Sequence, residues 1–278
     1  MSDSIQCRVC SERILPFMSF GQMPLGNGFK DPYQKEKEYK FEMKVAVCKN
    51  CSTFQLIDQP EPKQMFHDEY AFFSGTSKRM AEHFKEFAVE VNKEISGNTS
   101  EKFVVEIGSN DGILIGNFTE LGIKHLGIEP SANVAKVAMS KSINTKVSFF
   151  SKDIAGEVIE EYGKADALIA ANVICHIPTI NDIAAGVERV LKDDGIFVFE
   201  EPYLGDVLEK TTYDQIYDEH VFLFSLTSVN AIFIKFNMEI FRAERQWTHG
   251  GSMRYWLCKK GARKIEDSVF SFINFEQN

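Results

Sequence analysis

The sequence has little clustered positive charge and no long apolar run. Over 278 residues the net charge is −9, and basic residues gather only in short pairs such as Lys259-Lys260. A protein that follows the phosphates of DNA or RNA needs a broad basic surface, so we expect no nucleic-acid partner. A membrane-spanning helix needs about 20 consecutive apolar residues, so we expect no membrane insertion either.

A secretion signal is also missing. Residues 1–7 lack the basic segment and the apolar segment that open a signal peptide. We therefore expect a cytoplasmic protein, in a compartment where thiols stay reduced. Its six cysteines are then predicted to be metal ligands or buried thiols rather than disulfides. The two that stand alone in apolar sequence, Cys175 and Cys258, are predicted to pack in the core.

The other four cysteines form two C-x-x-C knuckles. Cys7 and Cys10 make the first, and Cys48 and Cys51 make the second. Each knuckle brings two thiolates close enough to share one tetrahedral zinc ion, and two knuckles complete a Cys₄ shell. Redox chemistry is the alternative, but it suits one such pair better than two. A closed shell has no open position for a substrate, so we predict a structural zinc.

Residues 103–112 carry the clearest signal for a bound small molecule. A short apolar run, typical of a buried parallel strand, leads into Gly108-Ser-Asn-Asp-Gly112. A helix is expected over 113–121, with its free N–H groups facing the glycine loop. The dinucleotide fingerprint G-x-G-x-x-G is incomplete, because the middle glycine that admits a pyrophosphate is missing.

A carboxylate follows one strand and one helix later. Glu129 ends the apolar run 125–129, at the spacing used to bind ribose hydroxyls. Two acids, Glu106 and Asp111, flank the loop and suit a cationic ligand better than a phosphate. This pattern favours S-adenosylmethionine (SAM) over NAD, with a ligand-free turn as the alternative. The residues expected to hold the cofactor are Glu106, Gly108, Asn110, Asp111, Gly112, Glu129, Pro130, Asp153 and Asn172.

Strands and helices alternate from residue 103 to residue 200, the pattern of a doubly wound parallel sheet. A helix over 78–94 precedes them. Later come a helix over 225–237 and a hairpin that adds an antiparallel strand, as in class I methyltransferases. The predicted fold class is α/β, a class I SAM-methyltransferase Rossmann-like sheet preceded by a small Cys₄ zinc-binding domain. The expected domains are zinc-binding (1–70), SAM-dependent methyltransferase (71–258) and the start of a C-terminal domain (259–278).

The motifs described so far and several others occur along essentially the whole chain in an order typical of one family. They are the two knuckles, Gly21–Asn27, Tyr70–Ser77, Glu82–Phe84, Glu106–Gly112, Gly127–Pro130, Asn172–His176, Glu201–Tyr203, Tyr217–His220 and His249–Arg254. On these residues the chain resembles the sugar C-methyltransferases of deoxysugar biosynthesis, which methylate a nucleotide-linked 4-ketohexose beside its ketone. The resemblance implies a nucleotide-sugar substrate and three domains: a zinc domain, a SAM domain and a third Rossmann-like domain.

The resemblance also implies catalytic residues, because Tyr217, Glu219, His220 and His176 match the family's active-site positions. Methylation beside a ketone requires a base for the α-proton, and His220 is predicted to be that base. Glu219 is expected either to orient His220 or to contact the sugar, and its charge is expected to raise the pKa of His220. Tyr217 is expected to bind a substrate oxygen, and His176 to steady the enolate. Two structural alternatives stay open: His176 as an ordinary structural histidine, and Tyr213, Tyr217 and His220 packing on one helical face.

Two departures from the family pattern bear on turnover. The family commonly has a tyrosine near Phe72 or Phe73, whereas this sequence has only Tyr70 beside the two phenylalanines. The chain also stops at Asn278, early in the third domain. We expect the helix 267–274 to expose an apolar face unless it docks on its own sheet or on a second chain. Docking on a second chain would give self-association or a complex with a partner. His249 is expected either to contact substrate or to serve its turn alone. The alternative functions are a zinc-ribbon SAM methyltransferase of RNA, which the acidic charge disfavours, and a truncated SAM-binding fragment without turnover.

Overall fold

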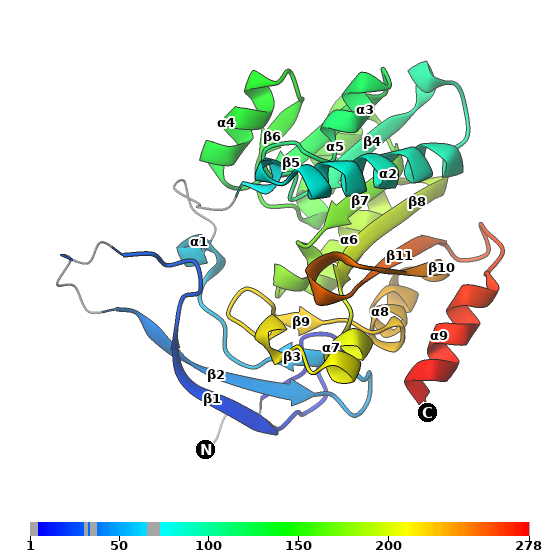
Figure 1. Ribbon diagram of the computed structural model, residues 1–278. Coiled ribbons are helices and arrows are strands. Elements are labelled where there is room, and N and C mark those ends of the chain that lie inside the picture. The colour runs from blue at the N-terminus through cyan, green and yellow to red at the C-terminus, as the bar shows by residue number, and fades with distance from the viewer. Residues whose placement is uncertain (1–4, 31–32, 34–37, 66–72, 278) are drawn as a thin grey trace.

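The computed structural model describes residues 5–30, 33, 38–65 and 73–277. Its centre is a seven-stranded sheet in the order β10-β11-β8-β7-β4-β5-β6 (Figure 1). The run from β8 to β6 is parallel, and β11 is antiparallel to both of its neighbours. The strands are β4 (Phe103–Ile107), β5 (Lys124–Glu129), β6 (Thr145–Val147), β7 (Ala165–Ala171), β8 (Leu191–Pro202), β10 (Met238–Gln246) and β11 (Ser252–Lys259).

Helices cover both faces of this sheet (Figure 1), because successive strand residues point to opposite sides and both sides are apolar. Val104 belongs to one core with Phe87 and Phe118, whereas Val105 belongs to the other core with Val187. The first face carries α2 (Lys78–Glu94), α3 (Gly116–Glu120) and α4 (Ala132–Ser140), and the second carries α5 (Lys152–Tyr162), α6 (Ile180–Val190) and α8 (Leu226–Phe233).

The N-terminal cysteine module, described over residues 5–30, 33 and 38–57, packs on the second face. Asn181 of α6 donates hydrogen bonds to the carbonyl oxygens of Arg8 and Val9 at 3.1 and 3.0 Å. The module also shares its sheet, of order β1-β2-β3-β9, with a late segment of the chain. Its strands are β1 (Met18–Pro24), β2 (Lys40–Val47), β3 (Phe54–Leu56) and β9 (Phe222–Leu223). The module is therefore completed by a strand that follows β8.

The predicted domain limits 1–70, 71–258 and 259–278 stay predictions. The first limit and the residues Tyr70 to Phe72 of one family motif lie outside the described part of the chain. The short helix α1 (Pro62–Met65) and the 3₁₀ turn η1 (Ser74–Thr76) stand on either side of this gap. None of the described helices is long and apolar enough to cross a membrane.

Two predicted helices are shorter in the structure. The expected helix 113–121 is reduced to α3, because the Ile115 N–H donates to the buried Glu106 carboxylate at 2.9 Å and holds the preceding residues in a turn. The expectation that a helix N-terminus faces the glycine loop is therefore wrong. The expected helix 225–237 ends as α8 at Phe233, followed by a 3₁₀ turn and Asn237 in the left-handed region at φ 56°.

The last helix, α9 (Asp267–Gln277), docks on its own domain, beside β10 and α8 (Figure 1). Val269 is buried there, and the Glu276 carboxylate accepts the N–H groups of Leu226 and Thr227 at 2.7 and 2.9 Å. A carboxylate at this position satisfies donors that open α8. Of the two expected ways to cover the helix, docking within the chain is the one observed, although Phe270 remains exposed.

Candidate active site

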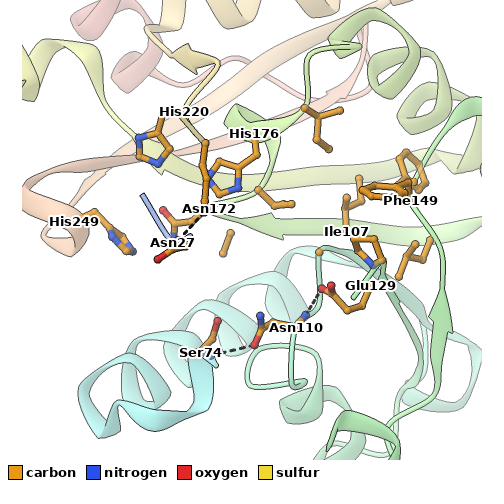
Figure 2. A pocket seen from close by; sticks show the side chains of 18 of the residues that line it. Asn27, Ser74, Ile107, Asn110, Glu129, Phe149, Asn172, His176, His220 and His249 are labelled. Atoms are coloured by element: carbon orange, nitrogen blue, oxygen red, sulfur yellow. Dashed lines mark hydrogen bonds between the residues drawn. The ribbon is translucent and has the colours of Figure 1, made fainter. Parts of the chain in front are cut away.

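A cavity of about 960 Å³ opens beyond the carboxyl ends of β4, β5 and β7 (Figure 2). This is where ligands bind in open α/β sheets. One part, the strand-end half, is lined by the loops that follow these strands and β6. The other part, the histidine half, is lined by residues from several distant segments. Its lining side chains include Asn27, His176, Tyr217, Glu219, His220 and His249.

Glu129 is the centre of the strand-end half. Its two carboxylate oxygens accept the N–H groups of Asn110 and Ser131 at 2.9 and 2.8 Å. Burial raises the pKa of this carboxyl group, and the hydrogen bonds from Ser131 and Asn110 oppose that effect. Each oxygen keeps a lone pair for a further donor. A ribose diol therefore fits at the cavity edge of Glu129.

Asn110 ties the glycine loop to the segment that covers it. The residue is in the left-handed region at φ 48°, a conformation that asparagine tolerates better than most residues. Its Oδ1 accepts the Ser74 N–H at 3.0 Å, while its own N–H reaches Glu129 (Figure 2). The turn η1 is thereby fixed over the loop, and Ser74 joins the cavity lining.

The histidine half is organised around His220. Its Nδ1 lies 2.7 Å from the carbonyl oxygen of Gln215, which can only accept, so Nδ1 carries the proton. Nε2 is then the nitrogen with a lone pair. Burial lowers the pKa of His220 to about 4, so the ring is neutral near pH 7. The expectation that Glu219 raises this pKa is wrong, because loss of solvent outweighs the other influences.

The neighbours of His220 come from three places in the sequence. The ring of Tyr217 lies 4.3 Å from the His220 ring, and the ring of His176 stacks on it at 5.3 Å. Glu219 is buried, and its Oε1 accepts a hydrogen bond from the Asn27 amide at 2.6 Å. Burial lowers the pKa of His176 well below its usual value, and a charge on His220 acts in the same direction.

His176 ends a short 3₁₀ turn, η3 (Ile174–His176), that rests on a buried carboxylate. Glu201 accepts the N–H groups of Val173 and Ile174 at 2.9 and 2.6 Å and interacts with the Cys175 thiol. Burial raises the pKa of Glu201 to about 7. The side chain therefore fixes the loop from which His176 reaches the cavity.

His249 reaches the cavity from a turn that is anchored on a second buried carboxylate. Thr248 donates to Glu200 at 2.7 Å, and Glu200 also pairs with His83 at 2.8 Å and with Arg254 at 3.0 Å. Burial would raise the pKa of Glu200, but its hydrogen bond to His83 and the charge of Arg254 hold it below the usual value. His249 itself is in the left-handed region at φ 51°.

The four cysteines of the N-terminal module converge. Their sulfur atoms all lie within 4.8 Å of one another, with 3.6 Å between Cys7 and Cys51 and 3.5 Å between Cys10 and Cys48. A tetrahedral zinc with Zn–S bonds of about 2.3 Å places its ligands about 3.8 Å apart, so the cluster fits this ion. The Gln55 amide donates to Cys7 Sγ at 3.1 Å, the kind of contact that supports a bound thiolate.

Two family models match the chain. One, described as "Methyltransferase domain", covers residues 78–242, more than half of the chain. The chain belongs to this methyltransferase family. The other, described as "Putative zinc binding domain", covers residues 7–66. The predicted fold class, a class I methyltransferase sheet preceded by a Cys₄ module, is confirmed.

The chain is similar to the C-methyltransferase NovU of Streptomyces niveus, with 31% identity over 250 residues, 89% of this chain. The chain spans 59% of the length of NovU. It is 26% identical, over 34% of its length and 38% of the relative, to a ubiquinone biosynthesis O-methyltransferase of Rhodopseudomonas palustris.

Solved structures agree with the fold. A magnesium protoporphyrin IX methyltransferase of Synechocystis with bound SAM superposes with a TM-score of 0.50 at 13% identity, covering 71% of this chain and 89% of that one. A Haloferax volcanii methyltransferase complex with its Trm112 activator gives 0.52 at 12% identity, covering 67% and 94%. At these identities the likeness concerns the fold alone.

The cavity collects most of the site residues expected from the sequence. The predicted residues in its lining are Gly108, Asn110, Glu129, Pro130, Asn172, His176, Tyr217, Glu219 and His220. Four predicted cofactor residues do not line it. Glu106 and Asp111 are buried behind the loop. Gly112 is buried where an added Cβ would lie 2.3 Å from the Ile143 side chain, and Asp153 is exposed on α5.

Sequence reasoning did not assign a site role to Asn27, Ser74, Phe149 or Phe150, all of which line the cavity. Asn27 lies in a family motif, so a signal for it was present. The two phenylalanines follow β6, and only this position after a strand end could have indicated that they line the site.

Proposed function

We propose that this chain is a SAM-dependent C-methyltransferase that acts on a nucleotide-linked 4-keto-deoxyhexose through an enolate formed by His220. The observation that carries the proposal is the orientation of His220. Its Nδ1–H is bound to Gln215, so Nε2 is the basic nitrogen of a neutral, buried ring at a cavity. A positioned base of this kind is what removal of an α-proton requires.

The strand-end half supports SAM as the methyl donor. Glu129 offers a carboxylate to the ribose hydroxyls, and Phe149 and Phe150 offer apolar contacts for the adenine. When bound there, SAM supplies an electrophilic methyl group on a sulfonium. The uncharged and acidic lining suits that cation, because no lysine or arginine occurs among the lining residues that the structure describes.

The histidine half supports a ketosugar as the acceptor. His220 Nε2 takes the proton beside the ketone, and the carbon that becomes nucleophilic then faces the strand-end half. Tyr217 and His176 lie within ring contact of His220 and can hydrogen-bond the oxygen that gains negative charge. Asn27 holds Glu219 beside them. Similarity to NovU, whose name describes a C-methyltransferase, supports transfer to carbon.

The net charge of −9 and the absence of a broad basic run in the sequence disfavour RNA as the substrate, and we retain the proposal of no nucleic-acid partner. A cytoplasmic location and self-association through the C-terminal region also stay proposals.

The test is incubation of the zinc-loaded chain with methyl-labelled SAM and a panel of nucleotide-linked 4-ketohexoses. We expect label on a sugar carbon next to the ketone, found by mass spectrometry and NMR. Label on oxygen, or transfer to RNA and to none of the sugars, would contradict the proposal. SAM binding without turnover on any sugar would leave a binding protein in place of an enzyme.

A further inference from the structure

A second group of side chains that could hold a metal ion lies at the wall of the histidine half, where His176 and His220 line the cavity and Cys175 is buried behind it. Cys175, His176 and His220 each offer one ligand atom, and these atoms all lie within 4.8 Å of one another. The two imidazole rings lie side by side on the cavity wall (Figure 2). Cys175 comes directly before His176, so η3 supplies two of the three ligands and the segment after Gln215 supplies the third.

The donor set is that of an open zinc site. One thiolate and two imidazoles leave a fourth position, which three-ligand sites keep for water or substrate. His220 is already held as metal-ligating histidines are, with Nδ1–H on a backbone carbonyl and the lone pair on Nε2. The thiol of Cys175 faces the Glu201 carboxylate, which can accept its proton when the sulfur binds an ion.

We propose that Cys175, His176 and His220 form a second, exchangeable site for a zinc-like divalent ion, and that this ion blocks proton abstraction while it is bound. The ion occupies the Nε2 lone pair of His220 and displaces one proton from Cys175. The blocking effect rests on the proposed function, because it requires His220 to be the base. Ion binding itself does not depend on that role.

The probe is Co²⁺, added to protein whose Cys₄ site keeps its zinc. We expect about one cobalt per chain beyond that zinc, with a thiolate-to-cobalt absorption band. Cys175→Ser should remove the band and weaken cobalt binding by more than about tenfold, since even a second-shell change often costs that much. Cys258→Ser, at another buried and isolated cysteine, is the matched control and should leave both unchanged.

Two controls separate the outcomes. Zinc content of every sample shows whether cobalt has entered the Cys₄ site, and SAM binding shows that each variant is folded. If Cys175→Ser does not fold, His176→Gln replaces it, with the same expected loss of affinity. Absence of a second equivalent in wild-type protein, or an unchanged band in Cys175→Ser, would overturn the site.

The second readout is deuterium uptake by a 4-ketohexose nucleotide in heavy water. Cobalt or zinc should suppress the uptake by wild-type protein, and a chelator too weak to strip the Cys₄ zinc should restore it. Cobalt that binds with the expected spectrum but leaves uptake unchanged would refute the blocking effect. If wild-type protein shows no uptake even without the ion, the proposed function fails, whereas the cobalt spectrum still decides the metal site.

Discussion

The two halves of the cavity are built in different ways. In the strand-end half, Asn110 and Glu129 are 19 positions apart, and the contact between them uses a backbone N–H. In the histidine half, Asn27 and Glu219 are 192 positions apart and meet through their side chains. The first half follows from consecutive strand–loop–helix units, whereas the second requires the cysteine module, β9 and the segment before it to be in place. The geometry of the proposed cofactor site is thus local, whereas that of the proposed acceptor site depends on segments far apart in the sequence.

The largest effect is expected from loss of the Cys₄ zinc. Cys48→Ser should unfold the module that carries Asn27 and pairs with β9, because metal binding stabilises such small units strongly. Methyl transfer should fall by more than about hundredfold. Calorimetry should still detect SAM binding, since Glu129 and the glycine loop lie on the central sheet. Cys258→Ser is the control, and simultaneous loss of SAM binding in Cys48→Ser would show that the halves are not separable.

The next largest effect is expected at Glu129. Glu129→Ala removes the acceptor for two backbone N–H groups and for the ribose, so SAM affinity should fall by about 1–3 kcal/mol. Glu129→Gln, which keeps one acceptor oxygen, should lose less. Titration calorimetry measures both. Unchanged SAM affinity in Glu129→Ala, in protein that remains folded, would place the cofactor elsewhere.

A smaller effect is expected at the contact between the cysteine module and the segment that carries Glu219 and His220. Asn27→Ala removes the hydrogen bond to Glu219 and should lower kcat/KM for the sugar by about tenfold, the rate equivalent of one such bond. SAM affinity should not change. Asn98→Ala is the matched control, because Asn98 also bonds a glutamate but lies outside the cavity. An equal loss in both variants would indicate general destabilisation.

The smallest effect is expected at Glu106, and it concerns the stability of the folded protein. Burial raises the pKa of Glu106 well above its usual value, and the charges of Glu129 and Asp111 act in the same direction. The folded protein then binds more protons than the unfolded chain, so wild-type stability should fall as pH rises above about 4.5. Glu106→Gln should remove the contribution of this group to the slope of the free energy of unfolding against pH. That contribution is at most about 1.4 kcal/mol per pH unit. Denaturant melts at several pH values measure the difference, and parallel curves would contradict it.

The sequence predicted the central fold well because its signals are local. The helix over 78–94 and the strand over 103–107 have the bounds of α2 and β4, since amphipathic spacing and a bounded apolar run specify them directly. The helix expected over 113–121 was too long, because periodicity does not reveal that Glu106 is buried and captures the Ile115 N–H. Two-residue β9 has no periodicity at all, so its pairing with β3 was not predictable.

The site shows the same division. The spacing from the glycine loop to Glu129 was sufficient to predict that Gly108, Asn110 and Glu129 meet at the strand ends. The histidines of the other half were named through family motifs, yet the lowered pKa of His220 was missed, because burial depends on segments far away in sequence. Glu106 and Asp111 were predicted to contact the cofactor, whereas the structure places them behind the loop, where they bond Ile115 and Gly75.

The central claim is that proton abstraction belongs to His220 and methyl donation to the strand-end half. Deuterium uptake beside the ketone of a 4-ketohexose nucleotide, measured by NMR in heavy water without SAM, tests it most directly. Wild-type protein and Glu129→Ala should both exchange the proton, whereas His220→Asn should be slower by roughly hundredfold or more and still bind SAM. Uptake that persists in His220→Asn, or that wild-type protein shows only when SAM is added, would contradict the claim.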